Sequence, residues 1–267
     1  MDEKLIESIV REVAKNINIA KNQDTFGIFD NMKEAIEYAY SSQKKFLSSN
    51  LECRRKIVDS IRNKLRPLIK EMSSMAVEET KMGRVEDKIN KNRLAIECST
   101  GVEDLQTKAF TGDDGISLVE YSPFGVIGAI TPVTNPTETI ICNSINMLAA
   151  GNSVVFSPHP NAIKVSNWIV GKINEAIMEV GGERNLVVTV SKTSVEDVDY
   201  MMEHPYINAL CITGGMPIVN KGLKSGKKTI GAGAGNPPVI VDETADIEQA
   251  ARDIVLGASL DNNMPCI

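Results

Sequence analysis

Between residues 121 and 242, short apolar runs alternate with longer stretches of helical periodicity. This alternation is typical of right-handed βαβ units, in which helices connect parallel strands and cover both faces of the sheet. We therefore predict an α/β fold with a Rossmann-like parallel sheet and helices on both faces, preceded by N-terminal helices. The predicted strands are 126–130, 153–156, 186–190 and 208–213, and the predicted helices are 137–150, 162–180, 195–203 and 217–225.

The first 84 residues are predicted to be mainly helical. Residues 1–18 form a short amphipathic pattern, followed by a polar linker. Asp30 is the expected N-cap of a helix that runs through Phe46, and Pro67 is expected to divide the next periodic run, with Gly83 ending the last segment. The apolar face of residues 1–18 must be buried against the chain's own domain or in a partner's groove, and the pattern leaves both open.

Composition excludes several classes of function. The 267 residues hold 29 basic and 35 acidic side chains, a net charge of −6, which predicts no nucleic-acid partner. A run of about 18 apolar residues is missing, so we predict no membrane helix. Five irregularly spaced cysteines and two histidines predict neither a disulfide framework nor a metal site, and indicate a reducing, cytoplasmic setting.

Candidate binding residues follow three of the predicted strands. Ligands of parallel sheets bind beyond the carboxyl ends of the strands, and backbone N–H groups before a helix suit a phosphate. Glycines after strands are also common turn residues, and no G-x-G-x-x-G follows the first strand. The candidates are Thr131 and Pro132 after the first strand, Ser157, Pro158 and His159 after the second, and Thr213, Gly214 and Gly215 after the fourth.

The region after residue 230 is predicted to be irregular at first. Residues 231–238 are rich in Gly and Pro, which indicates a linker, a hinge or a close approach of the backbone to a ligand. Residues 239–241 are predicted to form a short strand. Asp246 is the expected N-cap of the next helix, with Gln249 completing a capping box. The sequence ends at Ile267, soon after a new segment begins, from which we expect a truncated chain.

Several motifs together resemble the aldehyde dehydrogenase superfamily. ITPVTNPTETIICNSINMLAAGNSVVFSPHP is followed in order by CITGG, GAGAGNPPVIVD and DNNMPCI. Over nearly the whole chain this combination is similar to the CoA-acylating branch, the acetaldehyde, propionaldehyde and butyraldehyde dehydrogenases of bacterial microcompartments. The resemblance implies that residues 19–236 form the cofactor-binding domain and that 237–267 begin a catalytic domain whose remainder is absent.

The resemblance also implies roles for individual residues. It makes Cys266 the nucleophile and Asn135 an oxyanion donor. Ser157 stands where hydrolytic members carry a Lys that binds the ribose, which leaves NAD and NADP both open. Ala232 stands where they carry the Glu that activates water, so the thiol of CoA is expected to take the acyl group. The cofactor-binding residues would be Thr131, Pro132, Ser157, Pro158, His159, Thr213, Gly214, Gly215 and Gly233.

The function implied is conversion of a short-chain aldehyde, CoA and NAD to acyl-CoA and NADH through a thioester on Cys266. Two alternatives stay open: a non-catalytic nucleotide-binding or shell-docking fragment, and a hydrolytic aldehyde dehydrogenase. Residues 1–18 resemble encapsulation peptides, which suggests docking to a shell protein inside a microcompartment. The full-length chain is expected to form a homo-oligomer, and the 267 residues alone are expected to be inactive. Taken alone, Cys266 would more often be a buried structural thiol and Asn135 a turn residue.

Overall fold

The computed structural model describes residues 26–265. Its centre is a six-stranded sheet with the order β1-β6-β5-β4-β7-β8, in which every neighbouring pair is parallel. The predicted α/β fold is therefore confirmed. The helix predicted for residues 1–18 and the predicted nucleophile Cys266 lie outside the described residues. The strands are β1 (Ile28–Phe29), β4 (Val126–Thr131), β5 (Ser153–Pro158), β6 (Val187–Val190), β7 (Ile207–Thr213) and β8 (Lys228–Ala232).

Two apolar cores lie on the opposite faces of this sheet. Within β4, Ile127 and Ala129 pack into one core, whereas Val126 and Ile130 pack into the other, as the period of a strand requires. β4, β5 and β6 are buried at every position, which explains their continuous apolar sequences. One face is covered by α2 (Met32–Phe46), α8 (Val195–Glu203) and α9 (Met216–Leu223), the other by α3 (Leu51–Leu65), α4 (Ile69–Thr80), α6 (Pro136–Ala149) and α7 (Ile163–Glu179).

Several predicted boundaries need correction. The N-cap of α2 is Asn31, not Asp30, because the Asn31 side chain accepts the Glu34 N–H while Asp30 accepts from the Ser191 hydroxyl. Pro67 does divide its run, in the short 3₁₀ turn η2 (Arg66–Leu68) between α3 and α4. α4 ends at Thr80 rather than at Gly83, since Lys81 already adopts a left-handed conformation.

The C-terminal region also differs from the prediction. Gly231 and Ala232 belong to β8 and not to a loop, because parallel pairing with β7 satisfies their backbone at the sheet edge. Residues 239–241 form no strand; they are exposed and no neighbouring strand pairs with them. Asp246 caps α10 (Ile247–Ser259) as predicted, but Gln249 donates its side chain to Asp253 instead of completing a capping box.

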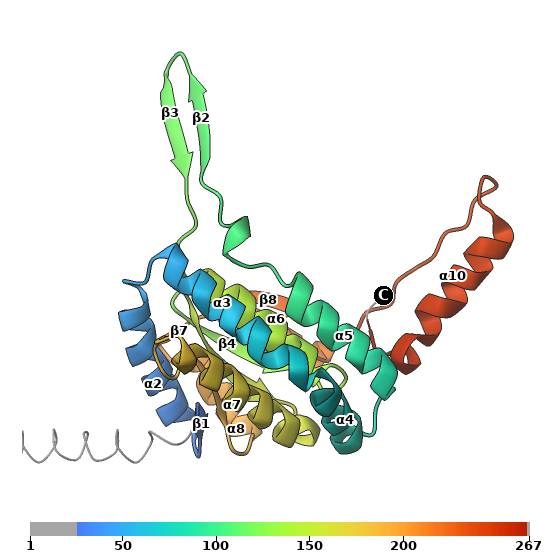
Figure 1. The fold of residues 1–267 in the computed structure, drawn as a ribbon, viewed down its shortest axis with the longest axis horizontal. Coiled ribbons are helices and arrows are strands. Elements are labelled where there is room, and N and C mark those ends of the chain that lie inside the picture. Colours follow the sequence, from blue (N-terminus) through green and yellow to red (C-terminus); the bar gives the residue numbers. More distant parts are fainter. Residues whose placement is uncertain (1–25, 266–267) are drawn as a thin grey trace, which may run out of the picture.

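Besides the edge strands β1 and β8, one helix and one hairpin were missed, and these two shape the molecule. α5 (Val85–Cys98) packs against α4 and α6. The antiparallel hairpin of β2 (Lys108–Gly112) and β3 (Gly115–Val119) projects far from the sheet in Figure 1, and all of its residues are exposed. Helix α10 also stands away from the sheet in Figure 1 and buries none of its own residues. Short 3₁₀ turns complete the chain: η3 (Val102–Asp104), η4 (Pro160–Ala162) and η5 (Leu260–Asn263).

Candidate functional site

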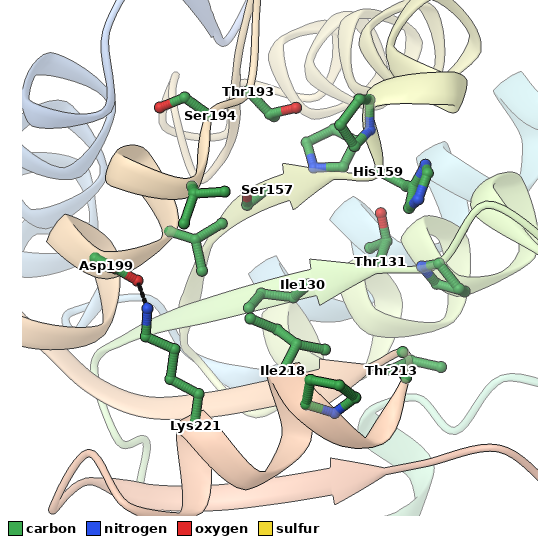
Figure 2. Close-up of a pocket in the computed structure, with 18 residues that line it drawn as sticks. Ile130, Thr131, Ser157, His159, Thr193, Ser194, Asp199, Thr213, Ile218 and Lys221 are labelled. Atoms are coloured by element: carbon green, nitrogen blue, oxygen red, sulfur yellow. Dashed lines mark hydrogen bonds and ion pairs between the residues drawn. The ribbon is translucent and has the colours of Figure 1, made fainter.

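A hollow of about 520 Å³ opens at the carboxyl ends of β4, β5 and β7, between α8 and α9 (Figure 2). Its volume lies in the range usual for small-molecule sites. It lies where the strand order reverses, because β5 and β7 flank β4 on opposite sides. The predicted residues that line it are Thr131, Pro132, Ser157, Pro158, His159, Thr213, Gly214 and Gly215.

Gly233 is the predicted binding residue that this hollow does not include. It follows β8, and a side chain there would collide with the Met216 sulfur at the start of α9. Gly214 lines the hollow, but its backbone N–H already donates to the Ala232 carbonyl at 3.1 Å, which continues the pairing of β7 with β8. Within the described chain, that N–H is therefore engaged by the sheet.

Three hydroxyl groups in the wall of the hollow are buried without a hydrogen-bond partner. They belong to Thr131, Ser157 and Thr193, which follow or end β4, β5 and β6. A buried hydroxyl without a partner costs free energy, and hydroxyl or phosphate oxygens of a ligand would satisfy it. Sequence reasoning missed Thr193, although the rule of reading strand ends applies equally to β6. The wall thus fits a sugar or phosphate ligand.

An ion pair closes one side of the hollow. Asp199 on α8 accepts a hydrogen bond from Lys221 on α9, and both side chains lie at the rim in Figure 2. Both are about half exposed, so the pair contributes little to folding. Apart from this Asp199–Lys221 pair, the described groups that line the hollow are apolar or polar side chains without a formal charge, so Lys221 is the one lysine or arginine among them at its edge.

A second hollow, of about 620 Å³, lies between α5 and α6 and includes Asn135 and Pro265 in its wall. Asn135 precedes α6, yet its side chain does not cap that helix. Its Nδ2 instead donates to the Met264 carbonyl at 3.3 Å, and the Asn135 backbone carbonyl accepts from the Thr139 hydroxyl. The structure therefore brings the predicted oxyanion donor next to the segment that leads to Cys266 in the sequence.

Buried charges surround this contact. The charge cluster consists of Lys88, Lys91, Glu138 and Asp261, and the Lys88 and Asp261 side chains are fully buried. The Asp261 carboxylate lies 3.2 Å from the Lys88 ammonium and 2.5 Å from that of Lys91, which is also 3.3 Å from Glu138. Lys88 donates to the Thr134 carbonyl at 2.8 Å as well. Two cations and two carboxylates thus compensate one another.

Asp261 also connects the C-terminal segment to the start of α5. It accepts the Arg84 N–H at 2.6 Å, and its own N–H donates to the Asp87 carboxylate at 3.0 Å. Gly83 lies directly under the carboxylate, so a side chain there would collide with it. Burial by itself raises the pKa of the Asp261 carboxyl, but hydrogen bonds from Lys91 and from the Arg84 N–H outweigh it and leave that pKa below its ordinary value.

The charge cluster was missed by sequence reasoning, although the sequence holds one signal. The buried stripe of α5 contains Lys88 and Asn92 beside Ala95 and Ile96. Polar residues at core positions of an amphipathic helix need buried partners, which points to a polar network. Asn92 donates to the Ser73 hydroxyl of α4, whereas the carboxylate partner of Lys88 is Asp261, too distant in sequence for periodicity to reveal.

The other cysteines show no sign of activation. Burial raises the pKa of the Cys142 and Cys211 thiols, which lowers the thiolate fraction at neutral pH. Among the described residues, no group of three or more His, Cys, Asp or Glu side chains is placed to hold a metal ion. In the same part of the chain, no helix combines the length and the apolar character needed to cross a bilayer.

Comparison with known proteins shows which family has this sequence and fold. The model of the "Aldehyde dehydrogenase family" matches residues 7–267. The propanal dehydrogenase (CoA-propanoylating) of Salmonella typhimurium is 54% identical over 90% of this chain and 52% of its own, and the acetaldehyde dehydrogenase (acetylating) of Escherichia coli K12 is 40% identical over 100% and 58%. The chain spans about half the length of these curated relatives.

Solved structures of aldehyde dehydrogenases resemble this chain as well. That of Rhodopseudomonas palustris propionaldehyde dehydrogenase with bound propionyl-CoA has a TM-score of 0.87 and 57% identity, covering 91% of this chain and 54% of that one. A propionaldehyde dehydrogenase from the Clostridium phytofermentans fucose utilisation bacterial microcompartment has the same TM-score with 52% identity, covering 90% and 55%. The resemblance stated from the motifs is confirmed, and the chain belongs to the aldehyde dehydrogenase family.

Proposed function

We propose that this chain carries the cofactor-binding region and the nucleophile of a CoA-acylating aldehyde dehydrogenase. The reaction joins a short-chain aldehyde, CoA and NAD or NADP to give acyl-CoA and the reduced cofactor. The observation that supports it most is the position of Asn135, whose amide Nδ2 faces the segment leading to Cys266 while β4 delivers Thr131 to the first hollow. The printed names of the relatives describe the same reaction class.

The first hollow is the proposed cofactor site. Thr131, Ser157 and Thr193 would offer their unpartnered hydroxyls to the sugar and phosphate groups, and Lys221 a positive charge at the rim. When bound, the nicotinamide ring accepts a hydride. No carboxylate follows β5 to repel a 2′-phosphate, so we propose that both NAD and NADP bind. An engineered glycolyl-CoA reductase with bound NADP+, 56% identical to this chain, supports the choice.

The chain's own residues would act in a fixed order. The Cys266 thiolate attacks the aldehyde carbon, and the oxygen gains a negative charge that the Asn135 Nδ2–H stabilises. After the hydride leaves that carbon, the acyl group stays on Cys266 as a thioester. The CoA thiolate then attacks the same carbon, and the Cys266 thiolate leaves as acyl-CoA forms. Ala232, at the end of β8, offers no base to activate water in place of CoA.

The test is reduction of the cofactor by the natural full-length polypeptide. We expect product formation with aldehyde that requires CoA, and its loss in Cys266→Ala. The variant Asn135→Ala should lower kcat about a hundred- to a thousandfold, the usual effect of removing one oxyanion donor. Equal turnover without CoA would instead indicate a hydrolytic enzyme. Full activity of Cys266→Ala would refute the proposed mechanism.

The second hollow is the proposed aldehyde side of the site. Polar side chains of α6 line it beside Asn135, among them Thr139, Asn143 and Asn146. Leu94, Ala95 and Cys142 line it as well, so its wall is mixed. Short-chain aldehydes are the proposed substrates because the curated relatives act, by name, on propanal and acetaldehyde. We expect kcat/KM to be highest for aldehydes of about two to four carbons and to fall as the chain becomes longer.

The exposed hairpin is the proposed oligomer contact. Phe110, Ile116 and Leu118 are 61%, 67% and 65% exposed, and a lone two-stranded ribbon is only marginally stable in water. We therefore propose that a second copy of the chain covers β2 and β3. For residues 1–18 we propose docking to a microcompartment shell protein, in line with the relative from such a compartment. Co-purification with shell protein after removal of residues 1–18 would contradict that docking.

A further inference from the structure

We infer that Lys91 is a positioning residue that fixes the orientation of the Asn135 side-chain amide; the inference rests on the proposed role of Asn135 as an oxyanion donor. The Lys91 ammonium donates a hydrogen bond to Asn135 Oδ1. On the opposite side of the amide, Nδ2 donates to the Met264 carbonyl. The two ends of the amide therefore face different parts of the site.

A lysine at this position selects one of the two orientations of the amide. The two ends of an asparagine amide have nearly the same shape, so packing alone distinguishes them poorly. A lysine ammonium has only donors, and only an oxygen can accept from it. With the amide turned around, N–H groups would face the Lys91 cation, and the Oδ1 lone pairs would face the Met264 carbonyl and the oxyanion. Lys91 therefore directs the donor end of Asn135 toward the reaction.

Two further observations agree with this role. Lys91 is itself held by two carboxylates, Asp261 Oδ2 at 2.5 Å and Glu138 Oε1 at 3.3 Å, so its ammonium has little freedom to turn away. Asn135 occupies the N-cap position of α6, where asparagine usually accepts a backbone N–H, but here its side chain makes no such bond. The amide is thus withdrawn from the helix and held by Lys91 instead.

The inference predicts a specific kinetic effect. We expect Lys91→Met to lower kcat about ten- to a hundredfold. A hydrogen bond to a charged group changes an equilibrium, here that between the two amide orientations, by about this factor. The KM for NAD should stay within about twofold of the wild-type value, because Lys91 does not line the first hollow. Because unfolded enzyme would also lower the apparent kcat at constant KM, kcat is expressed per active site, counted by single-turnover formation of reduced cofactor.

A double-mutant cycle separates this role from a structural one. If Lys91 acts through Asn135, the double variant Lys91→Met/Asn135→Ala should have the same kcat as Asn135→Ala alone. Lys64→Met is the matched control. Lys64 lies on α3, far from Asn135 in the sequence, and is also partly buried. Its ammonium bridges two carboxylates of α7, those of Glu175 at 3.2 Å and Glu179 at 2.6 Å. The small effect of this variant on kcat should persist in the Asn135→Ala background.

The outcomes are distinct. Multiplicative effects of Lys91→Met and Asn135→Ala would overturn the inference, as would a wild-type kcat for Lys91→Met. Slower alkylation of Cys266 in Lys91→Met, together with multiplicative effects, would show that Lys91 acts on the reactivity of the Cys266 thiol. That result would also contradict the inference. If Lys91→Met does not fold, Lys91→Gln enters the same cycle, because its amide offers both a donor and an acceptor and no longer selects one orientation of Asn135. No CoA-dependent turnover in the wild type would instead defeat the proposed function.

Discussion

The attachment of the C-terminal arm, residues 247–265, depends on the Asp261 carboxylate. Helix α10 buries none of its residues, whereas Asp261 is fully buried and binds Lys88, Lys91 and the Arg84 N–H. We predict that Asp261→Asn, which keeps the shape and the tolerance of a left-handed backbone, releases the arm. Lys91 would keep Glu138 as a charged partner, but Lys88 would lose its carboxylate and keep only neutral acceptors such as the Thr134 carbonyl.

The size of this effect follows from the burial. Breaking a buried ion pair and leaving one charge uncompensated costs roughly 3 to 5 kcal/mol, which corresponds to a hundred- to several thousandfold change in the undocking equilibrium. The backbone N–H groups of Arg84 and Asp261 report it directly, because both are bonded across the junction. Their hydrogen exchange should accelerate by about that factor.

The matched control is Asp253→Asn, which removes the same charge from the exposed surface of α10 and should leave both exchange rates within about threefold of wild type. Acceleration of less than about tenfold in Asp261→Asn would show that other contacts hold the arm. The pH dependence has a defined sign. The pKa of Asp261 is lowered, so its contribution is complete above the unfolded pKa of about 3.9 and is lost as the pH falls below it.

Three further outcomes are expected. Ser157→Asp places a carboxylate at the end of β5 and should weaken NADP binding at least tenfold relative to NAD, measured by titration of each cofactor. Leu118→Asp should shift the sedimentation of the natural full-length protein toward smaller species, because it puts charge on the exposed hairpin. Cys142 and Cys211 should alkylate more slowly at pH 7 than Cys98, which is exposed, and should approach its rate only as the pH rises above the ordinary thiol range; equal rates at pH 7 would contradict the effect of burial.

The sequence was most informative where strands and helices are local and buried. The continuous apolar runs of β4 and β5 and the helical stripe of α7 appear within a few residues of their predicted limits. The part of the first hollow that lies at the strand ends was predicted, because parallel strands bring their carboxyl ends to one edge whatever the helices between them do. Thr131, Ser157 and Thr213 illustrate this, each coming from a different strand. The part that α8 and α9 contribute, with Val198, Asp199 and Lys221, was not predicted.

Features that depend on distant contacts escaped prediction. β8 carries Gly231 and Ala232, and only pairing with β7 makes a strand of that composition. The hairpin of β2 and β3 is exposed on both faces, so no buried alternation marks it. Lys88 and Asp261 meet across 173 positions of sequence. The place of Lys88 in the buried stripe of α5 signals that it has a buried partner, but not which residue that partner is.

The three residues Asp261, Asn262 and Asn263 have consecutive positive φ angles of 47°, 55° and 63°. Aspartate and asparagine tolerate this conformation better than other residues with side chains, and β-branched residues tolerate it poorly. Most other residues at these three positions would therefore favour negative φ angles and change the direction of the chain just before Met264 and Pro265. A directed-evolution library that varies the triplet freely would contain mainly such variants. Efforts to change the substrate of the proposed enzyme should leave the triplet intact and diversify the wall contributed by α6.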